Sequence, residues 1–450
     1  MNERDERDSA PRRGPRRQSR IPSGRLERLA RIGLLAGETA LGTLLERARR
    51  GGARAAGRSS LLSRGNAQRL AARLSHLRGA AMKLGQLLSL HGDELLPPEF
   101  TEALAVLRSD ADAMPEAQLH RVLARNLGKG WRDRFASFDP VPIASASIGQ
   151  VHAARTHDGR EVALKIQYPG VARSIESDVD NLASALRLTR ILPLELELSG
   201  IVAEAKRELR READYLAEAD SQERYAALVA DEPALVVPRV LREHCTRRVL
   251  CMDRLQGVPL EDLRGAEHSQ ALRDRVGALL YRLLFRELFA FRFMQTDPNL
   301  ANYLWLPREE KVGLLDFGAT RELADGLVAS YAALTRASIR RDRRALLAAC
   351  HEQGFLAPEE RADRVEGFLD LLILGAEPLR TPGPYDFAAS DLPGRVQRLG
   401  LDLTFRRGFL RAPPPETLSL QRKLGGMFLV AARLRARVDV QALAREFLGT

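Results

Sequence analysis

The sequence is short of cysteine, and it has no apolar run long enough to cross a bilayer. Its cysteines, Cys245, Cys251 and Cys350, show neither metal-ligand spacing nor a disulfide framework, which favours a reducing compartment. The first residues lack the apolar core of a signal peptide, and their acidic residues argue against a transit peptide. We therefore expect a cytoplasmic protein, with peripheral attachment to the inner face of the membrane left open.

The sequence is also short of lysine. Only six of its 70 basic residues are lysines, so the net charge of +11 and the pI of about 10 come almost entirely from arginine. A basic chain favours an anionic partner such as a phosphoryl compound or an anionic membrane surface. The arginines are spread along the chain without interleaved aromatic residues, so no nucleic-acid partner is expected. Each lysine that is present becomes informative, because arginine occupies almost every other basic position.

The length of 450 residues favours more than one domain or lobe, and the texture of the sequence divides it into four segments. A disordered basic tail is expected at 1–24, and helices with apolar residues at three- and four-residue steps at 25–130. Short strands dominate 131–255, and helices return over 256–450. The expected class is α+β.

Several elements are predicted in more detail. A helix that holds GAAMKLGQLLSL should stop at the Pro97–Pro98 pair, and another should run from Pro115 towards Leu127 and end at Gly128. Strands are expected at Val151–Arg155 and Glu161–Gln167, joined by a hairpin at His157-Asp158-Gly159. A long helical stretch should follow at Ser199–Leu228. Further strands are expected around Val236–Arg242, Arg248–Asp253 and Val312–Leu315, the last of them alone within the helical 256–450 segment.

A small-residue loop precedes the first of these strands. The stretch ASASIGQV keeps the frame of the protein-kinase phosphate loop, G-x-G-x-x-G-x-V, with alanine at the first two glycine positions. Alanine costs about 1 kcal/mol wherever a left-handed conformation is required, so a stiffer loop is expected. Main-chain N–H groups of such a loop can face phosphate. The predicted nucleotide-binding residues are Ala144, Ser145, Ala146, Ser147, Ile148, Gly149, Gln150 and Val151.

A strand lysine follows the loop. In VALK, Lys165 stands where a kinase lysine contacts the α- and β-phosphates. Its carboxylate partner should lie on the following helix, where READYLAEAD offers Glu212, Asp214 and Glu218. We expect Glu218 to pair with Lys165, although a run of acids is often only a solvated helix face.

The strongest signal comes from two later motifs. In QTDPNLAN, Asp297 and Asn302 have the D-x-x-x-x-N spacing of a kinase catalytic loop, and Asp316-Phe317-Gly318 follows an apolar strand. Asp297 is predicted to orient the attacking hydroxyl or water, while Asn302 and Asp316 hold Mg²⁺ against ATP. Together with the loop and the lysine, these motifs predict a bilobal protein-kinase-like fold that uses ATP and Mg²⁺. The His-Arg pair that usually precedes the catalytic aspartate is Gln295-Thr296 here, so switching by activation-loop phosphorylation is not expected.

One further motif has no place in a standard protein kinase. In AMKLGQLLSL, Lys83 and Gln86 lie three residues apart on one face of a predicted helix, and Gly85 permits close approach of another element. The spacing alone also fits an amphipathic packing helix.

Taken together, K-x-G-Q, ASASIGQV, VALK, Glu212-x-Asp214, QTDPNLAN, DFG and RKLGGMFLVAARLRAR resemble the UbiB (AarF/ADCK) family of atypical kinase-like proteins, in its ubiquinone-supporting branch. The resemblance covers about residue 25 to the C-terminus. It implies a helical extension, carrying K-x-G-Q, that covers the active site in place of a protein substrate. By resemblance, Lys83 and Gln86 line the nucleotide site, and Glu212 and Asp214 hold their helix.

The resemblance implies an atypical kinase or ATPase in ubiquinone or isoprenoid-lipid metabolism that does not phosphorylate proteins in trans. Quinone-biosynthesis enzymes, lipid precursors and a second copy of the chain are the partners left open. Two alternatives also stay open: a protein kinase, and a non-enzymatic, nucleotide-gated scaffold that binds lipid. The scaffold would bind ATP and survive Asp297→Asn in a complementation test.

Overall fold

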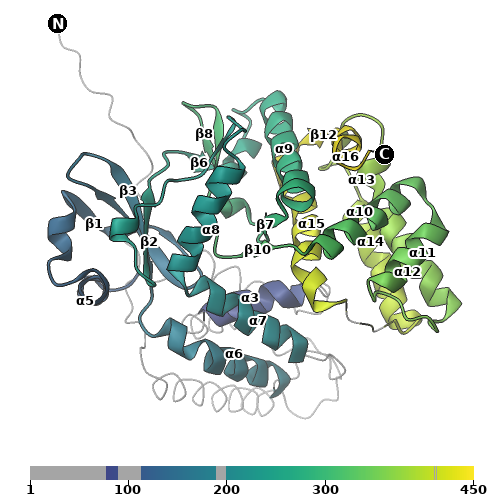
Figure 1. Ribbon diagram of the computed structural model, residues 1–450, viewed down its shortest axis with the longest axis horizontal. Coiled ribbons are helices and arrows are strands. Elements are labelled where there is room, and N and C mark those ends of the chain that lie inside the picture. Colours follow the sequence, from purple (N-terminus) through teal and green to yellow (C-terminus); the bar gives the residue numbers. More distant parts are fainter. Residues whose placement is uncertain (1–77, 90–112, 189–198, 410, 412, 450) are drawn as a thin grey trace, which may run out of the picture. The chain divides into compact units, whose positions relative to one another are not determined.

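The computed structural model describes residues 78–89, 113–188, 199–409, 411 and 413–449 (Figure 1). The expected tail at 1–24, the first helix from Arg25 and the helix stop at Pro97–Pro98 lie outside these residues. The described chain separates into two compact units. Unit 1 runs to Tyr215 and also takes in Arg242–Cys251, and unit 2 comprises Leu216–Leu241 and everything from Met252 onward. The mixture of helix and sheet is α+β, as the sequence predicts.

The sheet of unit 1 has four strands in the order β1-β2-β3-β5. The strands β1 and β2 are antiparallel, as are β2 and β3. The predicted hairpin between β2 and β3 is confirmed, and Gly159 turns the chain at a φ of +84°, a conformation that glycine adopts without steric cost. The bounds are β1 Ser137–Ser145, β2 Gly149–Arg155, β3 Glu161–Gln167 and β5 Val249–Asp253.

The helices of unit 1 pack on one another. The helix α3 contacts both α6 and α7, and α6 also contacts α7. The helix α5 ends where the sequence predicts, because Gly128 follows it at a φ of +95°. The bounds are α3 Arg78–Ser89, α5 Glu116–Leu127, α6 Val171–Leu188 and α7 Ser199–Glu212, with 3₁₀ turns at Trp131–Arg134 and Arg242–His244. The sequence reading did not predict α6.

The predicted helical stretch over 199–228 consists of two helices in the structure. The helix α7 ends at Glu212, and α8 (Tyr215–Leu228) begins after a break. At the break, Gln167 Nε2 donates to Ala213 O at 2.9 Å. A side chain from β3 thus satisfies a backbone carbonyl at the end of α7, and helical periodicity alone cannot reveal such a tertiary contact.

Unit 2 contains a second four-stranded sheet, in the order β4-β9-β8-β6. The strands β4 and β9 are parallel, whereas β8 is antiparallel to both β9 and β6. Two further ladders join β7 to β10 and β11 to β12. The bounds are β4 Leu235–Val236, β6 Val258–Pro259, β7 Phe293–Gln295, β8 Tyr303–Leu306, β9 Lys311–Leu314, β10 Thr320–Glu322, β11 Tyr385–Asp386 and β12 Arg437–Val438.

The strand β9 confirms the prediction at 312–315, but the expectation that the rest of 256–450 is helical is wrong. The additional strands contain two to four residues each, which is too short for an alternating pattern to register. The strand expected at 236–242 is also much shorter in the structure, as β4 covers only Leu235–Val236. A 3₁₀ turn at Arg242–His244 occupies its expected end.

Helices complete unit 2 around one large apolar core. The core combines residues of α8, α9, α10, α15 and α16 with the β7, β8 and β9 strands. The bounds are α9 Gln270–Phe285, α10 Asp325–Arg340, α11 Arg343–Glu352, α12 Ala362–Gly375, α13 Glu377–Arg380, α14 Leu392–Leu401, α15 Pro415–Leu434 and α16 Val440–Leu448, with shorter helical turns at Leu260–Arg264, Arg286–Phe291, Leu300–Asn302 and Asp402–Arg406. None of the helices in the described ranges is both long and apolar enough to cross a membrane.

Candidate functional site

The alanine-bearing loop forms a tight connection between β1 and β2 in unit 1. Ser145 ends β1 and Gly149 begins β2, and Ala146 N donates to Gly149 O at 2.9 Å. Neither Ala144 nor Ala146 has a positive φ. The alanines therefore avoid the steric cost that a left-handed loop would impose, because this turn does not use left-handed angles.

Gly149 has a packing role at the end of this loop. A Cβ atom added to it would lie 2.5 Å from Ile166 O and 2.8 Å from Tyr215 Oη. Its φ is not positive, so glycine is needed here for close approach of the backbone and not for a special turn. The loop is thereby held against β3 and the start of α8.

Lys165 lies on β3, directly across from Val151 of β2. Its side chain is buried, and its Nζ lies 5.2 Å from the centroid of the Tyr215 ring. The ring face attracts the ammonium group. The strand register thus places the predicted phosphate lysine next to the strand that continues from the loop.

The side chain of Gln150 is occupied by contacts within unit 1. Its Oε1 accepts from Met114 N at 2.9 Å, and its Nε2 lies 2.7 Å from His152 Nε2. The other ring nitrogen, His152 Nδ1, lies 2.9 Å from Asp139 O. Burial lowers the pKa of His152, so the ring is neutral, donating from Nδ1 and accepting at Nε2. If Gln150 contacts the nucleotide as predicted, it must therefore do so through its main chain.

The helix α3, which carries K-x-G-Q, packs directly on the loop. A Cβ at Gly79 would lie 2.8 Å from Ile148 Cγ2 and 3.5 Å from Ser147 O. Gln86 lies in the same helix three residues after Lys83, and its side chain is outside the described part. The structure therefore brings together the K-x-G-Q helix and the small-residue loop.

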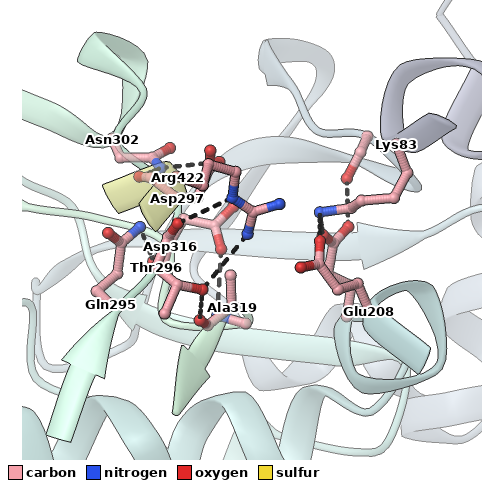
Figure 2. A network of polar contacts seen from close by, with 12 residues as sticks. Lys83, Glu208, Gln295, Thr296, Asp297, Asn302, Asp316, Ala319 and Arg422 are labelled. Carbon is pink, nitrogen blue, oxygen red and sulfur yellow. Dashed lines mark hydrogen bonds and ion pairs between the residues drawn. The ribbon is translucent and has the colours of Figure 1, made fainter. Parts of the chain in front are cut away.

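Lys83 is 3% exposed and is paired with two carboxylates of α7. Its Nζ lies 3.0 Å from Glu208 Oε2 and also pairs with Glu212 Oε1 (Figure 2). Glu212 Oε2 in turn accepts from Ser147 Oγ at 2.9 Å. One carboxylate thus links the K-x-G-Q helix to the loop.

Two details of this acidic cluster differ from the sequence reading. Glu208 was not predicted, although its position four residues before Glu212 on α7 places both on one helix face. Asp214 lies beyond the end of α7, and its Oδ2 is 4.0 Å from Arg247 Nε.

The catalytic-loop motif lies in unit 2, between β7 and β8. Asn302 Nδ2 donates to Asp297 O at 3.1 Å and to Asp297 Oδ2 at 3.3 Å (Figure 2). Asn302 ends a 3₁₀ turn that Asn299 caps by accepting from Ala301 N. The five-residue spacing therefore closes into a compact loop that brings the carboxylate and the amide into contact.

Asp316 follows β9 and has a φ of +58°. This left-handed conformation is uncommon for a residue with a Cβ and is a form of strain that clusters at functional sites. The carboxylate Oδ1 accepts from Gly318 N at 3.2 Å, which helps to hold the turn.

The segments that carry Asp297 and Asp316 are joined by hydrogen bonds. The strands β7 and β10 pair, with Gln295 opposite Thr320. Gln295 Nε2 donates to Asp316 O at 3.3 Å, and Thr296 Oγ1 donates to Ala319 O at 2.6 Å (Figure 2). The predicted catalytic and metal-binding residues of unit 2 are thereby brought together.

The helix α8 packs against the DFG segment within unit 2. Phe317 is 2% exposed, and its ring centroid lies 5.0 Å from that of Tyr225. A Cβ at Gly318 would lie 3.4 Å from Glu218 Oε2. Glu218 therefore lies beside the DFG turn, and its predicted pairing with Lys165 stays a prediction.

The two residues that the sequence predicts as metal ligands, Asn302 and Asp316, offer oxygen atoms of the type that Mg²⁺ prefers. Within the described residues, no group of three or more histidine, cysteine or acidic side chains forms a metal cage. Mg²⁺ commonly takes only one or two protein oxygens and completes its shell with phosphate oxygens and water. A carboxylate and an amide are hard ligands of this type.

Comparisons with known proteins give the family. Residues 106–350 match the model of the ABC1 atypical kinase-like domain. The chain is 40% identical over 434 residues to rat mitochondrial atypical kinase COQ8B, covering 96% of this chain and 81% of the relative. It is 36% identical over 439 residues to mitochondrial atypical kinase COQ8 of Saccharomyces cerevisiae, covering 96% and 86%. The chain belongs to the ABC1 (UbiB) atypical kinase family.

A solved structure of this general architecture agrees with the assignment. The chain resembles Rv3197 of Mycobacterium tuberculosis, solved in complex with erythromycin, with a TM-score of 0.58 and 27% identity over 85% of this chain and 96% of that one. The predicted kinase-like α+β fold and the UbiB resemblance are therefore confirmed. The motifs lie on the types of element that the sequence indicated, except that Asp214 lies between α7 and α8 and not on a helix.

Proposed function

We propose that this ABC1 family protein is a Mg²⁺- and ATP-dependent atypical kinase or ATPase. Asp297 orients the attacking hydroxyl or water, and Asn302 and Asp316 bind the Mg²⁺ that accompanies the nucleotide. Bound Mg²⁺ would neutralise charge that develops on the phosphates. The observation that carries the proposal is the direct contact of Asn302 with Asp297, beside an Asp316 backbone held at a φ of +58°.

The residues of unit 1 are proposed to serve the same nucleotide. Lys165 binds the α- and β-phosphates, with Glu218 as its partner, and the main chain of residues 144–151 faces the phosphates. The burial of Lys165 beside the Tyr215 ring supports this role, because the β3 strand and the ring hold the lysine side chain in one position. Lys83 and Gln86 are proposed to line the nucleotide site, and Glu212 and Asp214 to hold their helix.

We propose that the protein does not phosphorylate other proteins in trans. The support is the packing of α3 on the loop, where Gly79 approaches Ile148 closely and Lys83 is buried between Glu208 and Glu212. A helix in this position occupies space that a protein substrate would need. A deletion of residues 1–130 that released transfer to a generic protein substrate would instead favour the protein-kinase alternative.

The pathway is proposed to be ubiquinone or related isoprenoid-lipid metabolism, acting at the cytoplasmic face of a membrane. The support comes from the family resemblance and from the similarity to COQ8 proteins across nearly the whole chain. Lipid precursors, quinone-biosynthesis enzymes, an anionic membrane surface and a second copy of the chain are the proposed partners. Stimulation of ATP hydrolysis by anionic vesicles that contain a quinone-precursor analogue would support this assignment.

The decisive measurement is binding of Mg-ADP and turnover of Mg-ATP by the full chain. Asp316→Asn should weaken Mg-ADP binding about tenfold or more, since one metal ligand loses its charge. Asp297→Asn should keep binding but lower turnover by about 10²- to 10⁴-fold. The matched control is Asp231→Asn, whose side chain is 71% exposed in the same unit and is expected to behave as wild type. Equal binding of Mg-ADP by wild type and Asp316→Asn would contradict the metal role.

A further inference from the structure

The helix α15 contacts the loop that carries Asp297. Arg422 is buried, and its Nε donates to Thr296 O at 3.2 Å (Figure 2). Its Nη2 donates to Thr296 Oγ1 at 3.4 Å. The two residues are 126 positions apart in the sequence. The guanidinium group thus holds both the main chain and the side chain of the residue that precedes the catalytic aspartate.

Lys423, the next residue of α15, anchors the other end of this segment. It is 2% exposed, and its Nζ lies 3.2 Å from Glu287 Oε2. It also donates to Gln295 Oε1 at 3.3 Å and to Tyr303 Oη at 3.4 Å. The Lys423 ammonium group therefore makes one ion pair and donates two hydrogen bonds.

Glu287 completes the buried network. Its Oε1 accepts from Gln295 N at 2.9 Å and from Tyr225 Oη at 2.8 Å. Burial by itself would lower the pKa of Lys423, but the Glu287 carboxylate and Tyr303 outweigh that effect and leave the pKa raised. Lys423 is therefore a charged group that holds Gln295 through both its own contact and that of Glu287.

Gly426 sets the distance between α15 and the loop. A Cβ at this position would lie 2.0 Å from Pro298 Cγ and 2.7 Å from Pro298 Cβ. At Gly425, by contrast, a Cβ would meet no atom within 4 Å. Only Gly426 of the pair must therefore be glycine, because Pro298, the residue after Asp297, lies directly against its backbone.

These contacts hold the residues that come directly before and after Asp297 in the sequence. Arg422 and Lys423 hold Thr296 and Gln295 on its N-terminal side, and Gly426 accommodates Pro298 on its C-terminal side. The histidine and arginine that precede the catalytic aspartate in most kinases are Gln295 and Thr296 here. In this chain the cationic side chains next to the catalytic aspartate come instead from α15, 126 and 128 residues after the positions that they contact.

We propose that Arg422 and Lys423 are positioning residues for the reaction at Asp297, and that Gly426 lets α15 approach closely enough for them to act. This inference rests on the proposed ATP-dependent function. Displacing the loop should lower the rate of phosphoryl transfer while leaving the binding of Mg-ADP nearly unchanged, because neither side chain is assigned to the nucleotide or the metal.

The test compares Gly426→Ala with Gly425→Ala in the full chain. Both changes make the same improvement in helix propensity, so they differ mainly in the collision with Pro298. Gly425→Ala should keep wild-type turnover. Gly426→Ala should lower the turnover of ATP by about a hundredfold, which is the scale of a misplacement of about 1 Å, with the Kd for Mg-ADP changed less than about threefold.

A second pair of variants tests the hydrogen bonds without a steric collision. Arg422→Met removes both contacts to Thr296 and keeps much of the aliphatic stem. Its control is Arg433→Met, at an exposed position of the same helix. Turnover should fall by about tenfold or more for Arg422→Met and stay unchanged for Arg433→Met, again with Mg-ADP binding kept.

Hydrogen–deuterium exchange of the peptide over 293–303 provides a readout that does not depend on activity. Exchange there should be faster in Gly426→Ala and Arg422→Met than in their controls. Wild-type turnover in both variants would overturn the positioning role, as would a parallel loss of Mg-ADP binding and turnover. A wild-type chain that does not hydrolyse ATP or transfer its phosphate would instead overturn the proposed function, so the two failures are distinguishable.

Discussion

Two buried lysines, one in each unit, solve the same electrostatic problem in different ways. Lys83 of unit 1 is 3% exposed and Lys423 of unit 2 is 2% exposed. Lys83 is paired with two carboxylates, Glu208 and Glu212. Lys423 is paired with one, and its other acceptors are neutral. A buried charge is costly unless it is paired, so both lysines depend on these partners.

The difference indicates different roles. Lys423 and Glu287 balance each other's charge in the core, and both side chains are almost fully buried. Lys83 has an excess of negative charge around it, and the Glu212 side chain is 14% exposed and also binds Ser147. We infer that Lys83 could release one of its two carboxylate partners and keep the other. Such an exchange would fit its proposed position beside the nucleotide. Lys423 has no such freedom, which suits a residue that holds a loop in place.

The largest expected effect is the loss of stability in Lys423→Met. The change leaves the Glu287 carboxylate buried without its counter-ion, so the free energy of unfolding of unit 2 should fall by about 3–5 kcal/mol. Urea unfolding followed by fluorescence of Trp305, which is buried in unit 2, measures this cost. Lys311→Met, at a partly exposed position, should cost far less. Adding Glu287→Gln should recover part of the loss, and a cost no larger than that of Lys311→Met would contradict the comparison.

Lys83→Met should have a smaller effect on unit 1. Glu212 is partly exposed and keeps its hydrogen bond from Ser147, so water and the hydroxyl compensate some of the lost attraction. The expected destabilisation is about 2 kcal/mol, measured through Trp131, which is buried in unit 1. The control, Lys206→Met, breaks a more exposed pair with Asp180 and should cost less than about 1 kcal/mol. If both variants cost the same, Lys83 is no more strongly held than a surface lysine.

The smallest expected effect is a difference between the two units in how their stability depends on pH. The pKa of His152 in unit 1 is lowered from 6.5 by burial, so the unfolded chain binds the proton first and unit 1 loses stability as the pH falls below about 6.5. The pKa of Lys423 in unit 2 is raised from 10.5, so its contribution is complete below that pH and is lost as the pH rises through the folded pKa.

Fluorescence can follow this pH effect because the chain contains two tryptophans, one in each unit. Trp131 lies edge-on to Phe138 at 5.1 Å, and Phe138 stacks on His152 at 5.3 Å. Trp305→Phe leaves Trp131 as the reporter of unit 1, and Trp131→Phe leaves Trp305 for unit 2. Mild acid should lower the urea midpoint seen by Trp131 more than that seen by Trp305, and His152→Gln should reduce this difference. Equal shifts in wild type would argue against the assignment.

The sequence by itself determined the family and the fold class of this protein. The order of the small-residue loop, Lys165, the D-x-x-x-x-N motif and the DFG turn predicted the kinase-like fold, and K-x-G-Q indicated the family. These signals are readable because each is a short, local spacing. The hairpin at Gly159 and the end of α5 at Gly128 were predictable for the same reason, since a glycine at positive φ is a local requirement.

Only the tertiary structure decided which segments far apart in the sequence contact one another. Gln167 donates a hydrogen bond to Ala213 O at the break between α7 and α8, where the helical pattern of the sequence continues. Glycines 149 and 426 are needed because atoms far away in the sequence approach their backbones, and nothing in their local sequence distinguishes them from Gly425. Arg422 reaches Thr296 across 126 residues. Such contacts depend on where folding places each segment, whereas periodicity and spacing report only on neighbours along the chain.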